Sequence, residues 1–308
     1  VSMRIAAVDL VSNTCFPALA AQELGFYREE GVDVEIELVS QIGATQALSE
    51  GSADAMIAGS VHDLLRQFPG WSGVKLLVAL SQGTPWLLTV RSDLSAKRGD
   101  FDALKGLRLT AAEGPDLVFK TLLAAGGLDP ESDVNIVHLP GSEARDVSFG
   151  VYAARGLESG QIDGFWSNAM GSATAVSRGV GKVHVDVRRG DDPAEVRFCT
   201  FAGVGTTDAF IEREPEQAAA VVRAIVKAQK ALRADPSRAA RVGEGLFPGD
   251  AAELITGIVE RDIAFYEPNI SEASVAKLNA FAQSVGHLSG PVPYEGVAAV
   301  RFRELWGC

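Results

Sequence analysis

Cys15 and His62 are the two side chains of the sequence with the chemistry of nucleophilic catalysis. Cys15 stands directly before "FPALAAQELG", a predicted helix, and a helix start favours the reactive thiolate form. His62 lies in another loop and could act as the base. In the other interpretation, Cys15 is a small packing residue in an apolar turn and His62 is a solvated or capping side chain. The residue types alone leave both interpretations open.

A larger group of residues has the chemistry of ligand binding. Hydroxyl, amide and glycine residues occupy loops before predicted helices, where free backbone N–H groups can hold polar or anionic groups. Trp86 and Trp166 could stack on a ligand or pack in the core. The predicted ligand-binding residues are Ser12, Asn13, Thr14, Cys15, Phe16, Ser40, Gln41, Gly43, Thr45, Gly59, Ser60, His62, Gln82, Trp86, Glu113, Gly114, Trp166, Ser167 and Asn168.

These loops connect strands and helices that alternate along the chain in two cycles. The alternation predicts parallel strands joined by right-handed crossovers. Ligands of such sheets bind beyond the carboxyl ends of the strands, so the loops there should form a site. The predicted strands are 4–10, 32–39, 53–59, 104–112, 132–140 and 162–166.

One pattern, Leu-x-x-Gly-x-x-Asp, occurs once in each cycle. It is found in "ALSEGSADAMIAG" (47–59) and in "GLESGQIDGFWSN" (156–168). The glycine can end a helix in the left-handed conformation, and Asp54 or Asp163 can then accept backbone N–H groups in the turn before a buried strand. Two copies in matching surroundings indicate two similar α/β lobes.

Two extended segments, 81–90 and 198–206, connect the cycles and are predicted to form a hinge. We therefore expect one lobe from residues 1–91 and 202–308 and a second from 92–201, with a cleft between them. The last third of the chain has four amphipathic helical segments, which we expect on outer surfaces. These segments are 214–236, 237–247, 249–268 and 271–288.

Composition excludes several classes of function. The 308 residues carry a net charge of -12 without a basic cluster, which disfavours nucleic acid and anionic lipid as partners. No apolar run approaches the roughly 20 residues that span a bilayer. Cys15, Cys199 and Cys308 lack zinc-ligand spacing, so no metal and no cofactor is expected.

Three stretches resemble the substrate-binding proteins of ABC transporters for nitrate, alkanesulfonates, taurine and thiamine-pyrimidine precursors. They are "FPALAAQELGFYREEGVDVEIE", "ALSEGSADAMIAGS" and "LKGLRLTAAEGPDLVFKTLLAAGGLDPESDVNIVHLP". The resemblance implies the two-lobe type II periplasmic-binding fold. This is an α/β fold with two mostly parallel sheets, a cleft and a two-segment hinge.

The resemblance also implies a function, which is to capture a small organic ligand and deliver it to a membrane permease without turnover. The expected ligand is a sulfonate, an aromatic acid or a pyrimidine-like molecule, bound by a monomer. The basic side chains near the predicted loops are Arg145, expected to be solvated, and Arg66, expected on an outer helix face. A strongly charged dianion is therefore disfavoured.

The expected location is periplasmic, or membrane-anchored outside the cytoplasm. A cytoplasmic protein that starts at Met3 is the alternative. Cytoplasmic enzymes of similar fold, the aromatic desulfinases and the fungal pyrimidine synthases, support an alternative function. Cys15 lies in the loop where the synthases place an active-site histidine. Ile57 and Ala58 stand where the desulfinases have an arginine, and the synthases' cysteine-rich segment is missing.

Overall fold

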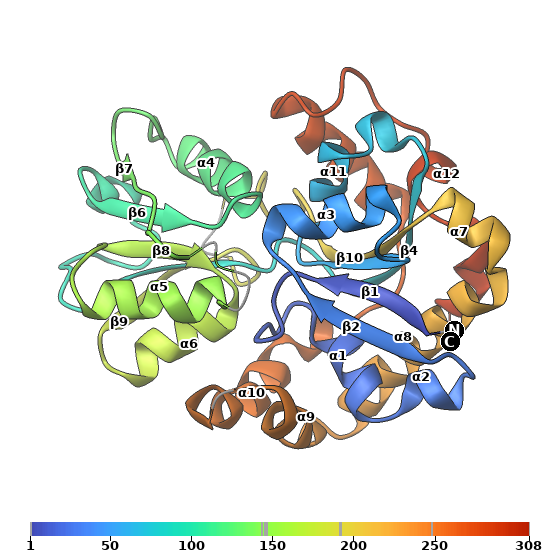
Figure 1. Cartoon of the computed structure of the whole chain (residues 1–308). Coiled ribbons are helices and arrows are strands. Elements are labelled where there is room, and N and C mark those ends of the chain that lie inside the picture. The colour runs from blue at the N-terminus through green and yellow to red at the C-terminus, as the bar shows by residue number, and fades with distance from the viewer. Residues whose placement is uncertain (1, 143, 145–146, 191–192, 248, 308) are drawn as a thin grey trace.

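Two separate five-stranded sheets form the two lobes of the molecule (Figure 1). The computed structural model describes residues 2–142, 144, 147–190, 193–247 and 249–307. The strand order is β2-β1-β3-β10-β4 in the first sheet and β7-β6-β8-β5-β9 in the second. This arrangement confirms the predicted α/β fold, although both sheets are mixed.

The first sheet begins with three parallel strands, β2 (Val34–Leu38), β1 (Met3–Ala7) and β3 (Ala55–Ala58). Strand β10 (Ala202–Thr207) then pairs antiparallel with β3 and with β4 (Val74–Ser81). Strand β10 thus adds residues from the last third of the chain to a sheet whose other strands come from the first third.

The second sheet repeats this plan. Strand β6 (Arg108–Ala111) lies parallel to β7 (Asn135–Ile136) and to β8 (Gly164–Ser167). Strand β5 (Leu87–Arg91) pairs antiparallel with β8 and with β9 (Gly181–Asp186). The chain crosses between the sheets at 82–86 and again at 187–201. The first crossing lies before the expected boundary at residue 91, because the hydrogen bonds of β5 place it in the second sheet.

Helices begin and end where local chemistry favours it. Helix α1 (Phe16–Glu23) has a proline in its first turn, where the missing N–H costs no hydrogen bond. Helix α3 (Gln41–Glu50) ends at Gly51, whose φ of 74° is left-handed. Helix α8 (Pro215–Ala234) buries one face against α1 and β4. The second lobe has α4 (Pro115–Ala125), α5 (Phe149–Glu158) and α6 (Ala169–Ser177).

Short helical segments complete the two lobes. They are α2 (Phe26–Glu29), η1 (Val61–Arg66), η2 (Pro69–Trp71), η3 (Phe101–Leu104), α7 (Asp208–Arg213), η4 (Ile263–Phe265), α12 (Tyr294–Val297) and η5 (Val300–Leu305). No helix among the described residues combines the length and the apolar character that crossing a membrane would require.

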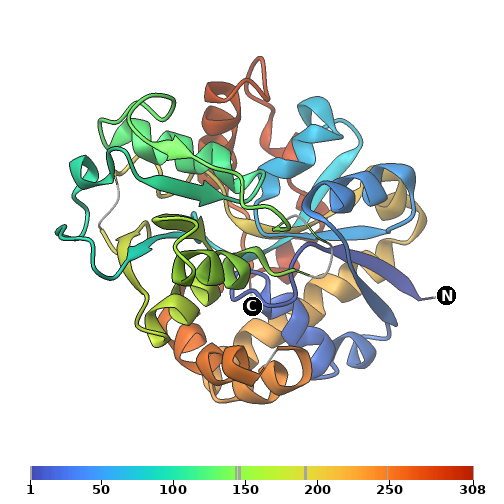
Figure 2. The same cartoon turned by 60° about the vertical axis from the view of Figure 1, so that its left-hand side comes forward.

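The C-terminal third contains the predicted helices α9 (Arg238–Leu246), α10 (Gly249–Asp262) and α11 (Glu272–Ser284). Helix α10 packs against α6 of the second lobe, and Figure 2 shows this pair at the edge nearest the viewer. These helices therefore do more than cover an outer surface, because α10 connects the first lobe to the second.

Asp54 and Asp163 occupy equivalent positions in the two lobes, as the repeated pattern predicts. Asp54 Oδ2 accepts the backbone N–H of Arg4 at 2.9 Å, and Asp163 Oδ2 accepts that of Arg108 at 2.9 Å. In return, each aspartate donates its own N–H to the carbonyl of that arginine, at 2.8 Å in both lobes. The prediction that these carboxylates accept backbone N–H groups is confirmed.

Candidate ligand-binding site

A cavity of about 290 Å³ lies between the lobes, at the carboxyl ends of strands from both sheets. The first lobe contributes residues that follow β1 and β2, and the second contributes residues that follow β6 and β7 or open α5. The lining residues are Val8, Asp9, Val39, Ser40, Ala111, Ala112, Glu113, His138, Ser142, Ala144, Val147 and Phe149. Ser40 and Glu113 are predicted site residues.

Two N-terminal caps hold equivalent loops of the two lobes in place. Ser40 caps α3 by accepting the Gly43 N–H at 3.2 Å, and Asn168 caps α6 by accepting the Gly171 N–H at 3.2 Å. A Cβ atom on Gly43 would lie 2.8 Å from Ser40 Oγ, so a glycine is needed there. The hydroxyl and amide of these predicted residues thus serve the helix starts.

Asp9 is the carboxylate that joins the first lobe to the second at the cavity. Its Oδ1 accepts the Val11 N–H at 2.7 Å. Its Oδ2 accepts hydrogen bonds from Ser148 Oγ at 3.1 Å and from Asn168 Nδ2 at 3.3 Å. Burial raises the pKa of Asp9 to about 6, although these three hydrogen bonds act in the opposite direction.

The loop of residues 12–16 is held by buried polar contacts. Asn13 Nδ2 donates to Asp262 Oδ2 at 2.9 Å, while Asn13 Oδ1 accepts the N–H of Ala169 in the second lobe at 3.0 Å. Ser12 Oγ accepts the N–H of Thr14 at 3.2 Å. Asn13 therefore positions one lobe against the other.

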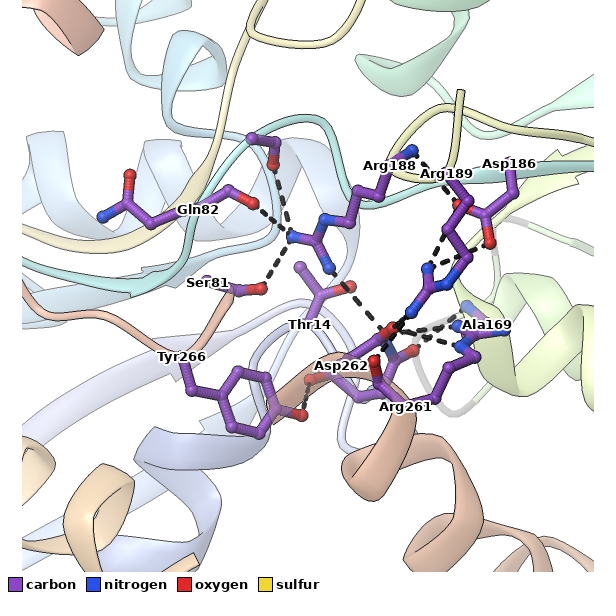
Figure 3. Close-up of polar contacts among 12 residues, drawn as sticks. Thr14, Ser81, Gln82, Ala169, Asp186, Arg188, Arg189, Arg261, Asp262 and Tyr266 are labelled. Atoms are coloured by element: carbon purple, nitrogen blue, oxygen red, sulfur yellow. Dashed lines mark hydrogen bonds and ion pairs between the residues drawn. The ribbon is translucent and has the colours of Figure 1, made fainter. Parts of the chain in front are cut away.

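Arg188 anchors the hinge from within the second crossing (Figure 3). Its Nη2 donates to Ser81 Oγ at 2.7 Å and to the Gln82 carbonyl at 2.6 Å, both in or next to the first crossing. The guanidinium lies 4.4 Å from the Phe265 ring centroid and 3.7 Å from Asp262. Burial lowers the pKa of Arg188 to about 10, which leaves it charged at neutral pH.

Asp262, at the end of α10, is the acidic centre of this hinge network. Arg189 Nη2 donates to its Oδ1 at 2.9 Å, and Arg261 Nε donates to the same oxygen at 3.1 Å. Burial acts to raise the pKa of Asp262, but the charges of Arg188, Arg261 and Arg189 outweigh it and the pKa is lowered. The carboxylate therefore remains ionised although it is 1% exposed.

Cys15 and His62 are both buried and are engaged in packing. Burial, with a smaller effect from the Asp9 charge, raises the pKa of Cys15 to about 12, so the thiolate is disfavoured. His62 Nε2 lies 3.3 Å from the Gly114 carbonyl of the second lobe, and burial lowers the pKa of His62. A Cβ atom on Gly114 would meet Asp63 Oδ1 at 2.4 Å, so this close approach of the lobes needs a glycine.

Trp86 and Trp166 lie in the core of the second lobe and not among the residues that line the cavity. The Trp166 ring stacks on Phe119 with 5.7 Å between centroids, and the Trp86 ring lies 6.0 Å from that of Trp166. Of the two interpretations open from the sequence, packing agrees with this placement.

The other predicted residues divide between core, turns and hinge. Phe16 and Thr45 are buried, Gly59 is close to Cys15, and Ser60 donates to Asp63 Oδ2 at 2.5 Å. Ser167 donates to the Asn168 carbonyl. Gln82 donates to the carbonyls of residues 267 and 269, which places it at the hinge. Gln41 begins α3, and Arg145 lies outside the described residues.

Arg66 was expected on an outer helix face but joins the two lobes instead. Its Nη1 donates to Glu113 Oε1 at 2.6 Å, which links η1 of the first lobe to the loop before α4 of the second. The sequence gives no sign of this contact, because it joins residues from different cycles.

The family described as NMT1/THI5 like matches residues 13–239. The chain belongs to this family. The match confirms the resemblance seen in the sequence. The match runs from the loop after β1 to beyond α8, so it includes most of the elements that shape the cavity, but not β1 itself.

Individual relatives of this NMT1/THI5-like protein include transport proteins and enzymes. The nitrate import ATP-binding protein NrtC of Synechocystis sp. is 25% identical over 238 residues, 70% of this chain and 32% of the relative. The chain thus spans about a third of that relative's length. The 4-amino-5-hydroxymethyl-2-methylpyrimidine phosphate synthase of Schizosaccharomyces pombe is 24% identical over 264 residues, 83% of this chain and 72% of the relative.

A solved structure shares the fold. The alkanesulfonate-binding protein SsuA of Xanthomonas axonopodis pv. citri, bound to MOPS, superposes with a TM-score of 0.70 at 14% identity. The superposition covers 96% of this chain and 97% of SsuA. The chain therefore has the same two-lobe fold as this SsuA protein.

Of the twelve residues that line the cavity, the sequence prediction named Ser40 and Glu113, and Asp9, His138 and Phe149 are among those it missed. Asp9 and His138 fall within the predicted strands 4–10 and 132–140, but β1 ends at Ala7 and β7 at Ile136. A charged or polar residue near the end of an apolar run could have indicated that the strand ends before that residue. Each such residue stands in the loop that follows its strand and so reaches the cavity.

Proposed function

We propose that this protein is the solute-binding component of an ABC importer and that it binds a small organic molecule between its lobes. The observation that carries the proposal is the cavity of about 290 Å³, lined by strand-end loops of both lobes. Interlobe clefts of this kind are where two-lobe proteins bind small molecules. The family match and the shared fold with SsuA support the same function.

Closure of the lobes around the ligand is the proposed mechanism. Contacts that cross between the lobes surround the cavity and its hinge, and they involve Asp9, Asn13, His62 and Arg66. These four contacts are polar, so opening breaks hydrogen bonds that water can replace. A ligand that touches both walls lowers the free energy of the closed form alone and shifts the population towards that form.

The partner in this proposal is a membrane permease that receives the ligand from the closed protein outside the cytoplasm. The protein itself acts as a monomer, because one chain supplies both walls of the cavity. Binding without turnover agrees with the high pKa of Cys15, which removes the nucleophile that the enzyme alternative requires.

Ligand-dependent closure provides the test. The melting temperature is measured with a panel of sulfonates, aromatic acids, amines and pyrimidines, and small-angle X-ray scattering then follows the radius of gyration. We expect at least one compound to raise the melting temperature and to be recovered unchanged. A protein that no member of the panel stabilises, or one that consumes its ligand, would contradict the proposal.

A further inference from the structure

Acidic and apolar groups surround the cavity. Its apolar wall comes from side chains such as Val8, Val39 and Phe149, and its charged groups are the carboxylates of Asp9 and Glu113. No lysine or arginine is among its lining residues in the part of the chain that the structure describes. A ligand here therefore meets an apolar surface with acceptor groups at its edge.

The two carboxylates differ in how they are compensated. Glu113 is exposed, and its Oε1 forms an ion pair with Arg66 at 2.6 Å. Asp9 is partly buried and accepts hydrogen bonds from neutral donors, namely a backbone N–H, a hydroxyl and an amide. No cation of the described residues contributes to its pKa. A carboxylate has about four acceptor positions, so Asp9 retains capacity for one more donor.

Other buried aspartates of the described chain do not share this state. Each of them lies within 4.0 Å of an arginine, as ion pairing of a desolvated charge requires. These residues are Asp63, Asp163, Asp186 and Asp262. Asp9 thus stands out as a desolvated carboxylate at the cavity with no cation of its own.

Polar groups at the helix starts around the cavity already have partners within the protein. Ser148 and Asn168 are the N-cap residues of α5 and α6, and the side chains of both donate to Asp9. Near the start of α3, Ser40 Oγ accepts the N–H of Gly43, and before α4 the Asp116 carboxylate accepts the N–H of Gly114. Helix starts are the usual place for an anionic ligand group. Here the Asp9 carboxylate lies against the N-cap side chains of α5 and α6, and its negative charge would repel an anionic ligand.

We propose that the ligand presents a nitrogen-bound hydrogen to Asp9, from a cationic amine or amidine or from an amino-substituted heterocycle, and lays its apolar body against Val39 and Phe149. This inference rests on the proposed function and narrows its ligand class. Of the classes expected from the sequence, it selects pyrimidine-like amines over sulfonates and aromatic acids.

Matched probes test the inference by isothermal titration calorimetry. Benzamidine and 4-aminopyrimidine supply N–H donors on an aromatic body, and benzenesulfonate and benzoate supply anions on a similar body. We expect the donors to bind more tightly than the anions. Asp9→Asn should weaken benzamidine binding roughly ten- to hundredfold, since a hydrogen bond to a charged group is lost. Asp102→Asn removes the same charge from an exposed site and should leave the affinity unchanged.

A pH series on the wild-type protein gives a second readout that needs no variant to fold. Benzamidine stays cationic, so its affinity should fall as acid protonates Asp9. His138 and Glu113 line the same cavity and Cys15 lies near Asp9. These three groups are unchanged in the Asp9→Asn protein. The Asp9→Asn protein, if folded, should have a flatter profile, and the difference between the two profiles belongs to Asp9.

Three outcomes would count against the inference, and they separate it from the proposed function. If benzenesulfonate or benzoate binds more tightly than both donors, the ligand class is wrong but the binding function stands. If Asp9→Asn leaves benzamidine affinity within about twofold, Asp9 does not receive the ligand. If no probe of either class binds, the proposed function fails together with the inference.

Discussion

Asp9 follows strand β1 of the first sheet, Asp163 precedes strand β8 of the second sheet, and the two carboxylates have different partners. Asp163 precedes β8, and the Arg108 side chain donates to both of its oxygens at 3.0 Å. Asp9 follows β1 at the cavity, and its donors are neutral. The Arg108 side chain is the largest influence that lowers the pKa of Asp163, whereas burial raises the pKa of Asp9 to about 6.

The comparison shows where the fold neutralises its own charges. At the ends of the strands away from the cavity, and in the hinge, arginines compensate the aspartates, so these carboxylates stabilise the protein. At the cavity, no cation of the described residues pairs with Asp9, and its buried carboxylate costs stability in the absence of a ligand. A charge that is costly in the empty protein and useful in the complex is typical of a binding site.

The largest effect that sharpens this comparison is expected in the hinge. Asp262→Asn removes the charge that compensates Arg188, which is 3% exposed, and Arg189. The free energy of unfolding should fall by about 3 kcal/mol, because a buried cation is left without its partner. Urea unfolding at neutral pH measures this. Asp235→Asn, on an exposed aspartate, is the control that should leave the transition midpoint unchanged. Equal midpoints for the two variants would refute the role of Asp262.

The repeated turns were predictable because their chemistry is local. A helix, a left-handed glycine and an aspartate before a buried strand fall within eight residues, and the structure has both copies as expected. The arginine partners could also have been found, since Arg4 and Arg108 occupy matching positions near the start of their strands. In each lobe the aspartate precedes one strand and the arginine lies on the parallel strand beside it, so the pairing of the two strands brings them together.

The site was only partly predictable, because it depends on where strands end and on contacts between distant residues. The apolar run of residues 4–10 does not show that β1 stops at Ala7, and that early end places Asp9 at the cavity. Arg188 and Asp262 meet only after both crossings have formed. The chemistry of Trp166 suits stacking on a ligand as well as packing, and its depth in the lobe is a tertiary property.

The next effect concerns the two equivalent turns. Asp163→Asn should cost about 1–2 kcal/mol of unfolding free energy, because two charge-assisted hydrogen bonds from Arg108 are lost. Asp54→Asn should cost less, because the Arg4 and Arg213 side chains lie 3.6 and 3.8 Å from its carboxylate. Urea unfolding of both variants at neutral pH gives the ranking. A larger loss for Asp54→Asn would contradict the comparison of the two turns.

Acid distinguishes these turns further. The folded-state pKa of Asp163 lies below that of the unfolded chain. Its contribution to stability is therefore present above about pH 4 and is lost as pH falls through the folded pKa. The Asp163→Asn protein should lose less stability than the wild type on acidification below about pH 4, which thermal unfolding across a pH series measures.

Asp9 should show the opposite pH dependence, with the smallest effect. Its folded-state pKa of about 6 lies above the ordinary value of 3.8, so the folded protein binds this proton more tightly than the unfolded chain. The stabilising contribution of the proton is full below the unfolded pKa and is lost as pH rises through about 6. Between about pH 7 and about pH 5 the wild type should gain about 1 kcal/mol that Asp9→Asn does not. His138 and Glu113 are present in both proteins, so the difference isolates Asp9. Parallel stability curves would show that its carboxylate is not destabilised by burial.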